Sequence, residues 1–518
     1  FSMKKKVLLT ALGTGQKDKN NKPYYREAIY EYNNNYFKTS YISEVFIEDN
    51  EYDEIIYLGT KTSGWDNLYE YYFNKLSEDN QNDDLTAIYF ELNDKVLDGT
   101  LTEEYLYQNI SPLIEKYYSK LYKKKMSIYF ALMDMGIDDK ELDNNLSFFM
   151  NLAKKHLLNQ EKIIDLDITH SFRSLPIFYY TMIQYLSVLD RDRKLEIGSM
   201  YYGMFETSKD VYGLKESLLP DNPQIKLNKE AYKLIDLAMG EDTFRPAKIV
   251  NLSNILDING WIQATYEFTN YGYAGNLSIM LEQYANILPN KESKEFIKLS
   301  EQIKRISFKL NTNEINNIYQ DLNDMSNTLK NIKNMREQKP FILATIDLLD
   351  TFTKNLLASN KGILVYLDNN FNHKYKLQYS VAMWYLDHSS YISFVTTLYE
   401  SLISFLVVIN KLGSDSIDNF EKRGTVKKQY QDFDCIGTLK DYKEYRDLSI
   451  EIKISIFINT LGKLRNDMAH VYSTKNHSSS YSKYTNNVNI LFKKNPKETN
   501  IYEEILSEYN KIIKESVI

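Results

Sequence analysis

Short β-branched and aromatic runs alternate with amphipathic helical stretches up to about residue 205, and this alternation constrains the fold most strongly. Strands that alternate with helices form a mostly parallel, doubly wound sheet with helices on both faces. The run Ile163–Ile168 is largely apolar, as a central strand of such a sheet should be. The expected strands are Lys5–Ala11, Glu54–Leu58, Thr86–Leu92, Ser127–Leu132, Lys162–Ile168 and Leu195–Tyr202, with expected helices such as Leu142–Leu158 and Pro176–Leu189 between them.

The pattern becomes helical after Pro246, where glycine and proline are sparser. The chain has 518 residues, too many for one ordinary domain. We therefore expect a Rossmann-like α/β domain at residues 3–245, a helical connector at 246–335 and an all-α domain at 336–518. The expected helical segments are Ile249–Phe268, Leu277–Leu288, Ser293–Lys309, Glu314–Lys333, Phe341–Ser359, Tyr379–Leu412 and Ile450–Arg465.

Composition excludes several classes of protein. Cys435 is the single cysteine, so the chain has no internal disulfide and no cysteine-based zinc site, which fits a reducing cytoplasm. No apolar run approaches the roughly 20 residues that span a bilayer, and no signal peptide is apparent. We therefore expect a cytoplasmic protein without membrane contact.

The net charge of -7 argues against indiscriminate nucleic-acid binding, and we expect no stable binding to DNA. Any contact with RNA would have to come from a local basic patch. Lys422-Arg423 with Lys427-Lys428 is such a patch, although a run of this kind also occurs as a solvated surface.

The string Leu464–His470 is the most informative short motif of the C-terminal half. It follows the apolar stretch Ile450–Leu461 and precedes a polar, Ser-rich segment. Arg465 and His470 are five residues apart in this string. On a helix that spacing is about 140°, so the two side chains would flank one face. Two such helices that met across a dyad would bring two arginines and two histidines into one cleft.

This set of residues suffices for RNA scission without a metal. His470 can remove the proton of a ribose 2′-OH or protonate the leaving 5′-oxygen, and Arg465 can stabilise negative charge on phosphorus. Asn466 can orient these groups or bind the ribose. The expected products carry a 2′,3′-cyclic phosphate and a 5′-hydroxyl. The alternative interpretation is that Arg465 and His470 are unconnected residues at a helix end.

No metal ion is expected to take part. The chain has six histidines, which are scattered, and it contains neither a His-Glu-x-x-His motif nor a cysteine pair.

The first strand leads directly into Gly13-Thr14-Gly15, where backbone amides could approach a phosphate closely. Asp18 stands where the dinucleotide-binding fingerprint needs its third glycine, which disfavours a nicotinamide-dependent dehydrogenase. The second strand ends at Thr60. In a doubly wound sheet these strand ends gather at one crevice, the usual ligand site.

A third strand end, Asp167–Pro176, contributes to the same crevice. It offers hydroxyl groups, one histidine and one arginine, a surface suited to phosphates and sugars. The alternatives are that Ser174 caps the following helix and that Asp167 ties down the loop. The residues of this segment expected to face a ligand are Thr169, His170, Ser171, Arg173 and Ser174.

These strand ends together resemble the sensor domains called CARF, for CRISPR-associated Rossmann fold. Asp167–Pro176 resembles the Asp-x-Thr-His signature of that family, with Ser171 where glycine is commonest. Further matches in the right order are Leu12–Gly15, Leu58–Thr60 with Trp65, and Tyr201–Gly203.

Arg465–His470 is similar to the active-site motif of HEPN ribonucleases. A CARF domain followed by a HEPN domain is the layout of the ancillary ribonucleases of type III CRISPR systems. The resemblance therefore implies a CARF domain at residues 3–245 and a HEPN domain at residues 336–518.

The resemblance implies a homodimer that binds a cyclic oligoadenylate and then cuts single-stranded RNA at a composite site made by both chains. We expect the activator to be cyclic tetra-adenylate, the commoner case in the family, and not cyclic hexa-adenylate. No residue of the chain indicates the ring size. Arg465, Asn466 and His470 would be catalytic. The residues that would face the activator are Gly13, Thr14, Gly15, Thr60, Thr169, His170, Ser171, Arg173 and Ser174.

Two further interpretations stay open. In the first, the chain is a cyclic-oligonucleotide sensor whose helical domain only dimerises or binds a partner. In the second, which is compatible with the nuclease, the CARF site slowly cleaves its own activator.

Overall fold

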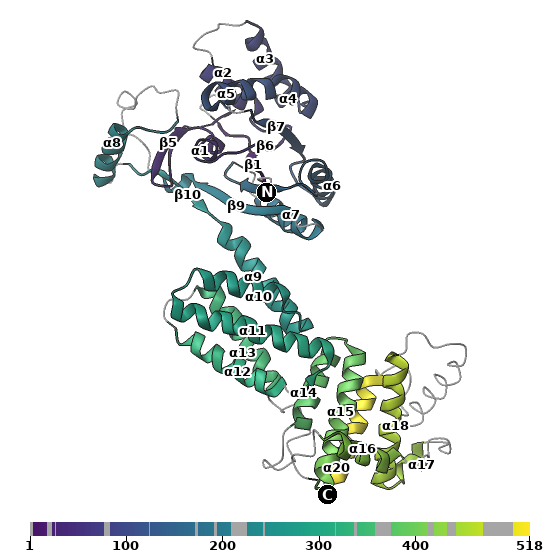
Figure 1. The fold of residues 1–518 in the computed structure, drawn as a ribbon. Coiled ribbons are helices and arrows are strands. Elements are labelled where there is room, and N and C mark those ends of the chain that lie inside the picture. The colour runs from purple at the N-terminus through teal and green to yellow at the C-terminus, as the bar shows by residue number, and fades with distance from the viewer. Residues whose placement is uncertain are drawn as a thin grey trace. The chain divides into compact units, whose positions relative to one another are not determined.

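The computed structural model divides into two units, Phe1–Leu256 and Asp257–Ile518, each of which is described by itself (Figure 1). The domain boundaries expected at residues 245 and 335 stay predictions. The described residues are 4–17, 23–25, 27–76, 83–123, 125–170, 175–190, 194–208, 225–241, 244–315, 318–335, 339–357, 374–412, 419–431, 442–469 and 501–517.

Within the described residues, eight strands of the first unit form one sheet with the order β5-β4-β10-β9-β8-β1-β6-β7. β7, β6, β1, β8 and β9 are parallel, whereas β5 and β10 are each antiparallel to one neighbour. After β1 the chain forms the β4–β5 hairpin at one end of the sheet, then adds β6 and β7 on one side of β1, and then adds β8 and β9 on its other side. The edge beside β1 and β8 is therefore a topological switch point. The strands are β1 (Lys5–Leu12), β4 (Ala28–Tyr32), β5 (Asn35–Thr39), β6 (Glu54–Thr60), β7 (Ser127–Met133), β8 (Lys162–Asp167), β9 (Leu195–Met204) and β10 (Ala247–Asn251).

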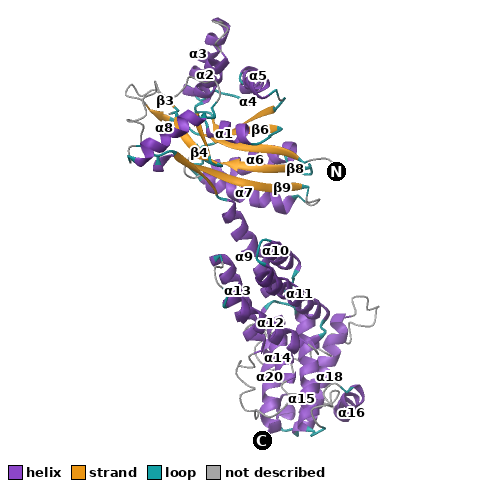
Figure 2. Ribbon diagram, turned by 60° about the vertical axis from the view of Figure 1, so that its left-hand side comes forward, coloured by secondary structure: helices purple, strands orange, loops and turns teal. Residues whose placement is uncertain are grey.

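Helices cover both faces of this sheet (Figure 2). Alternate residues of β1 point to opposite faces. Leu8 and Leu12 pack with α1, α2 and α5, and Val7 and Leu9 pack with α6 and α7. The remaining elements of this unit are β2 (Gln16–Lys17), β3 (Pro23–Tyr24), α1 (Ile42–Asp49), α2 (Trp65–Leu76), α3 (Asp83–Leu97), α4 (Glu103–Asn109), α5 (Ser111–Tyr122), α6 (Asp139–His156), α7 (Leu175–Leu189), the 3-10 turn η2 (Phe205–Thr207) and α8 (Lys229–Gly240).

The expected mostly parallel α/β sheet is confirmed, but the strand expected at Thr86–Leu92 is wrong. This segment lies in helix α3. Leu92 and Val96 are buried and Ile88 is half-buried, so the inward positions recur every four residues, as in a helix. Phe90, which made the segment look strand-like, is 61% exposed.

Three strands of the sheet were not expected from the sequence. β4 and β5 form a hairpin, and β10 joins β4 to β9. The helix expected from Ile249 begins only at Ser253, because Ala247–Asn251 pairs with β9. The partners of β10 are distant in the chain, so no local pattern marks its pairing, whereas β4 and β5 are joined directly by the turn Asn33-Asn34.

The second unit is helical in its described residues, which confirms the expected helical C-terminal part. One hydrophobic cluster runs from Trp261 to Ile513 through these helices. The segment Tyr379–Leu412 divides into two helices at a turn where Ser389 has a φ of 58°. The helices are α9 (Ser253–Tyr271), α10 (Gly275–Asn286), α11 (Asn290–Thr312), α12 (Ile318–Lys333), α13 (Pro340–Leu357), α14 (Lys374–Asp387), α15 (Tyr391–Ile409), α16 (Phe420–Gln431), α17 (Tyr442–Arg446), α18 (Ile450–Ala469) and α20 (Ile501–Val517).

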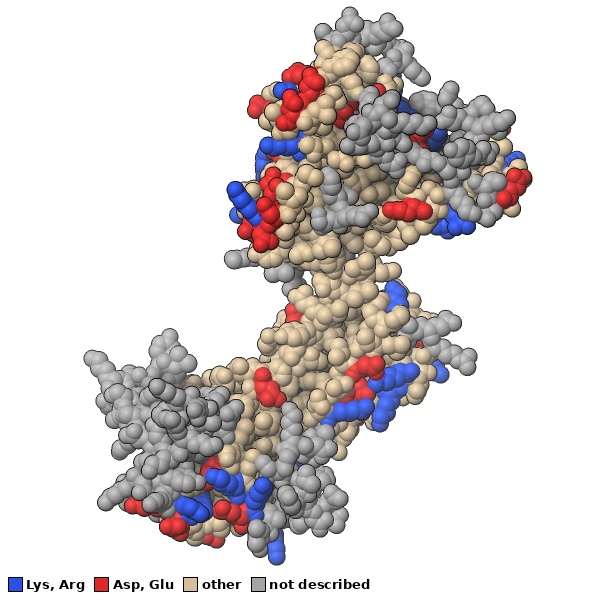
Figure 3. Space-filling view, turned by 180° about the vertical axis from the view of Figure 1, so that it is seen from behind, with Lys and Arg blue, Asp and Glu red and all other residues tan. Residues whose placement is uncertain are grey.

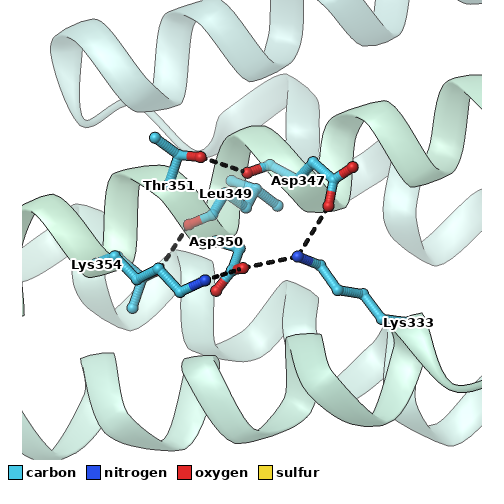
Figure 4. A network of polar contacts seen from close by, with 7 residues as sticks. Lys333, Asp347, Leu349, Asp350, Thr351 and Lys354 are labelled. Carbon is cyan, nitrogen blue, oxygen red and sulfur yellow. Dashed lines mark hydrogen bonds and ion pairs between the residues drawn. The ribbon is translucent and has the colours of Figure 1, made fainter.

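A polar network ties the end of α12 to α13 (Figure 4). Nζ of Lys333 lies 2.8 Å from Asp347 and 2.7 Å from Asp350, and Lys354 reaches the same Asp350 oxygen at 2.8 Å. The hydrogen bonds and charges of these partners raise the pKa of Lys333 against the opposing effect of burial. The network stabilises this corner of the helical unit.

α15 is the most apolar helix of the described residues. Its 19 residues are long and apolar enough to cross a membrane, which the sequence analysis did not anticipate. However, 67% of the apolar stretch is buried inside the helical unit. α15 therefore packs as the core helix of a soluble protein packs, with α14, α16 and α18 around it.

A buried ion pair links β6 to β8 across β1. Nζ of Lys162 lies 2.6 Å from Glu54, and the two side chains are only 5% and 6% exposed. We predict that Glu54→Ala lowers the local free energy of unfolding by about 3 kcal/mol, because it leaves a buried charge unpaired. Hydrogen exchange of the backbone amides in β6 and β8 measures this local free energy of unfolding.

Lys5→Ala is the matched control. Lys5 contacts the same carboxylate at 3.5 Å, but its side chain is 65% exposed. Its loss should cost at most about 0.5 kcal/mol. Equal effects of the two substitutions would contradict a special role for the buried pair.

Candidate functional site

The carboxyl ends of β1, β6 and β8 lie side by side at the switch point. Leu12 is opposite Gly59 of β6, and Thr10 is opposite Asp167 of β8. The loops that follow these strands therefore meet at one edge of the sheet. They carry the predicted activator-facing residues Gly13, Thr14, Gly15, Thr60, Thr169 and His170, whereas Ser171, Arg173 and Ser174 lie outside the described residues.

Hydrogen bonds join the loop after β6 to the loop after β1. The Gly64 amide donates to the Gly13 carbonyl at 2.8 Å, and the Ser63 hydroxyl donates to the Leu12 carbonyl at 2.7 Å. The Thr60 amide donates to Ser63 Oγ at 2.9 Å. The side chain of Thr60 is buried and its hydroxyl lies 3.3 Å from the same oxygen. Thr60 thus shapes the loop from within.

Tyr25 fills the space between these loops. Its hydroxyl donates to the Gly13 carbonyl at 2.5 Å, and its ring meets the His170 ring edge-on at 5.2 Å. A Cβ on Gly64 would lie 2.7 Å from the Tyr25 ring, and a Cβ on Gly13 would lie 2.3 Å from the carbonyl oxygen of His170. Both glycines are therefore required by this packing. Sequence reasoning did not single out Tyr25, because no motif or spacing marks it.

Thr14 and Gly15 are the exposed part of the first loop. Gly15 has a φ of 74°, the left-handed region that favours glycine. Thr14, with its hydroxyl group, is therefore the exposed polar side chain of this loop.

Asp167 is fully buried and links three strands. It accepts hydrogen bonds from the Thr10 hydroxyl at 2.7 Å and from the Thr169 hydroxyl at 2.6 Å and amide at 3.0 Å. The Thr169 hydroxyl in turn accepts from the Gly203 amide of β9 at 2.9 Å. Burial raises the pKa of Asp167 to about 6, although these hydrogen bonds oppose the rise. These contacts agree with the interpretation that Asp167 ties down the loop.

The His170 ring packs among aromatic side chains in this structure. Its ring packs against Tyr25 and Tyr41, and no hydrogen-bond partner of its Nε2 is found among the described residues. Burial lowers the pKa of His170 to about 4, so the imidazole is neutral at pH 7. Its assignment as a residue that contacts the activator stays a prediction.

The second candidate site is the C-terminal end of α18. The Arg465 guanidinium lies 4.8 Å from the centre of the Tyr399 ring, and one of its nitrogens lies 3.9 Å from Glu400. Asn466 is exposed, and its Oδ1 accepts a hydrogen bond from Nη2 of Arg465 at 3.3 Å. The face of an aromatic ring attracts a guanidinium, so Tyr399 helps to hold Arg465 in place.

A surface groove of about 680 Å³ surrounds Arg465. Arg423, Lys427 and Lys428 of the predicted basic patch line it together with Arg465, against the carboxylates of Glu400 and Glu421. Four cations thus face two carboxylates among the described lining residues. The groove is locally positive although the chain as a whole carries a net charge of -7.

Figure 3 shows a face on which most described residues are uncharged, and lysine and arginine lie in small groups beside aspartate and glutamate. Such mixed surfaces attract nucleic acid poorly. A local groove is therefore the kind of place where this chain could hold RNA.

His470, the predicted catalytic partner of Arg465, lies outside the described residues. In the part of the chain that the structure describes, no three histidine, cysteine or acidic side chains are grouped so as to hold a metal ion. The catalytic assignment of Arg465, Asn466 and His470 and the absence of a metal stay predictions.

Two comparisons with known proteins show what this chain is similar to. Residues 257–360 match the family described as CRISPR-associated protein MJ1674, second domain, and the match begins where the second unit begins. CRISPR-associated protein MJ1674 of Methanocaldococcus jannaschii is 27% identical to this chain over 465 residues, which cover 86% of the chain. These matches support a CRISPR-associated protein. The chain spans 62% of the length of that relative.

The raised pKa of Asp167 predicts a pH dependence of stability. Its carboxyl group binds a proton more tightly in the folded state than in the unfolded state, so the carboxyl destabilises the fold as pH rises from about 4 to about 6. Asp167→Asn should remove this contribution, which is on the order of 2 kcal/mol over that range.

The measurement is the free energy of unfolding of wild type and Asp167→Asn at several pH values between 4 and 7. Glu44, whose pKa burial raises to about 7, contributes equally to both proteins and cancels in the difference. A difference that does not change with pH would contradict the assignment.

Proposed function

We propose that this chain is an endoribonuclease of type III CRISPR antiviral defence, activated by a cyclic oligoadenylate. The observation that carries the proposal is the position of Arg465 near the end of α18, where it lines a locally positive groove and donates a hydrogen bond to the exposed Asn466. The similarity to a CRISPR-associated protein over most of the chain supports the biological setting. The cytoplasm is the proposed location.

The proposed reaction is an attack of the ribose 2′-oxygen on the neighbouring phosphorus. The 2′-OH loses its proton, the bond from phosphorus to the 5′-oxygen breaks, and the leaving 5′-oxygen gains a proton. His470 would carry out one of these proton transfers, and in a dimer the second histidine would carry out the other. The products are a 2′,3′-cyclic phosphate and a 5′-hydroxyl.

Arg465 would stabilise the charge that develops on the phosphate oxygens. Its guanidinium is always charged, and its planar fork matches phosphate geometry. Its position on Tyr399 limits the motion of the guanidinium before RNA arrives. This preorganisation is the main source of rate enhancement by a group of this kind.

The loops at the switch point would bind the activator. The exposed Thr14 would offer its hydroxyl to a phosphate, and Thr169 is held in the loop after β8 by its hydrogen bonds with Asp167 and Gly203. Cyclic tetra-adenylate is the proposed activator and a homodimer the proposed assembly. Slow cleavage of the activator by these loops stays a prediction.

The direct test is cleavage of a fluorogenic single-stranded RNA by wild type and His470→Ala, with and without each cyclic oligoadenylate. We expect cleavage by wild type with one activator and none by the variant, which should still bind that activator. Binding of an activator without cleavage of any RNA would instead favour a sensor whose helical domain acts through a partner.

Arg465→Ala should lower kcat by about 100-fold or more, which corresponds to roughly 3 kcal/mol of transition-state stabilisation. Lys463→Ala is the matched control, because Lys463 is exposed on the same helix and is not among the described residues that line the groove. Equal rates for the two variants would overturn the role of Arg465.

Chelation of divalent metals should leave the rate of wild type unchanged, because both proton transfers and the charge stabilisation come from side chains. The rate is measured with and without EDTA at fixed ionic strength. An absolute requirement for magnesium would contradict the proposed mechanism.

A further inference from the structure

Three helices meet around Arg465, and each contributes a charged or aromatic group to its surroundings. α15 carries Tyr399 and Glu400, α16 carries Arg423, and α18 carries Arg465 itself. Arg423 is the most deeply placed of the three charged side chains, with 17% of its side chain exposed, against 29% for Arg465 and 42% for Glu400. The group nearest to solvent is therefore the carboxylate that lies between the two arginines.

Arg423 is fixed on α15 by three contacts. Its Nη1 donates to the Ser404 hydroxyl at 2.7 Å, and its Nη2 donates to the Glu400 backbone carbonyl at 3.3 Å and to Oε2 of the Glu400 side chain. The planar fork of arginine makes such a set of contacts possible, and the ammonium of lysine could not reproduce it. These donors are directed at α15, so they are poorly placed to bind RNA.

As a result, the two carboxylate oxygens of Glu400 contact different arginines. Arg423 holds Oε2, and Oε1 lies 3.9 Å from Nη1 of Arg465. That separation is too long for a hydrogen bond, so it attracts the guanidinium without occupying its donors. Arg465 is thus located by the Tyr399 ring and by the Glu400 carboxylate, and its Nη2 donates a hydrogen bond to Asn466 Oδ1 at 3.3 Å. Neither Tyr399 nor Glu400 forms a hydrogen bond that would compete with a phosphate for the guanidinium.

We infer that Glu400 and Arg423 are positioning residues of the cleavage site: Arg423 clamps Glu400, and Glu400 aligns Arg465 for the phosphate. The inference rests on the proposed ribonuclease function. It adds two residues, separated by 23 positions from each other and by more than 40 from Arg465, to a motif that contains neither of them. Their effect is exerted through Arg465 and not by contact with RNA.

Kinetics of Arg423→Ala, Glu400→Gln and the double variant test this chain of contacts. We expect each single variant to lower kcat by about 10- to 100-fold, the usual effect of a displaced reacting group, with little change in KM. Because Arg423 acts through Glu400, the double variant should be no slower than the slower single variant. Arg423→Lys should not restore the rate.

Lys463→Ala is again the matched control. It removes the same charge from an exposed position of α18, is not among the described residues that line the groove, and should leave kcat unchanged. A rise in KM with unchanged kcat in Arg423→Ala would overturn the inference, since it would make Arg423 an RNA-binding residue. Multiplicative effects in the double variant would also overturn it, because the two residues would then act independently.

A crystal structure of Arg423→Ala supplies a readout that does not depend on catalysis. We expect the Arg465 guanidinium to leave its place 4.8 Å from the centre of the Tyr399 ring. An unmoved guanidinium would overturn the positioning role. If wild type cleaves no RNA with any activator, the proposed function fails, and this structure still decides whether Arg423 positions Arg465.

Discussion

The parallel pairing of β1 with β6 on one side and with β8 on the other is the constraint on which the first unit depends. Because these three neighbouring strands are parallel, the loops that follow β1, β6 and β8 all begin at the same edge of the sheet, with β6 and β8 on opposite sides of β1. The buried Asp167, which accepts a hydrogen bond from Thr10, fixes the register of this central pair. The candidate ligand site is therefore a consequence of strand order.

In the helical unit the candidate site depends on the contacts that hold the half-buried Arg465 guanidinium in place. α15, the most apolar helix, forms the support on which α16 and α18 pack, and it carries Tyr399 and Glu400 at the surface of the groove. The ring and the carboxylate together locate Arg465. The same helix thus supplies both the core of the unit and the surroundings of its candidate site.

Much of the fold could be predicted from the sequence because local patterns determine it. The parallel strands are marked in the sequence by apolar runs, and the helices of the second unit are marked by apolar residues at helical spacing. Thr86–Leu92 was wrong because its aromatic residues imitated a strand while its buried positions followed a helical period. β10 was missed because its partners β4 and β9 are distant in the chain. The β4–β5 hairpin is local, and its signal was the turn at Asn33-Asn34, where both residues have positive φ, which the sequence analysis did not use.

The candidate sites were predictable where a motif marks them and not elsewhere. The loops of Gly13 and Thr169 meet as expected from strand order. Tyr25, which packs between those loops, and Arg423, which reaches Glu400 from another helix, act through contacts that only the folded chain creates. Arg423 stood out in the sequence only as one member of a basic run.

The central claim is that one chain joins an adenylate sensor to an RNA-cleaving site. The most direct test compares two titrations with cyclic tetra-adenylate, one of binding and one of the RNA cleavage rate, for wild type and for Thr14→Ala, a change at an exposed residue of the first loop. The account predicts that the variant shifts the dissociation constant and the half-activating concentration by the same factor, with an unchanged maximal rate. Cleavage that needs no activator, or a shift in one titration without the other, would contradict it.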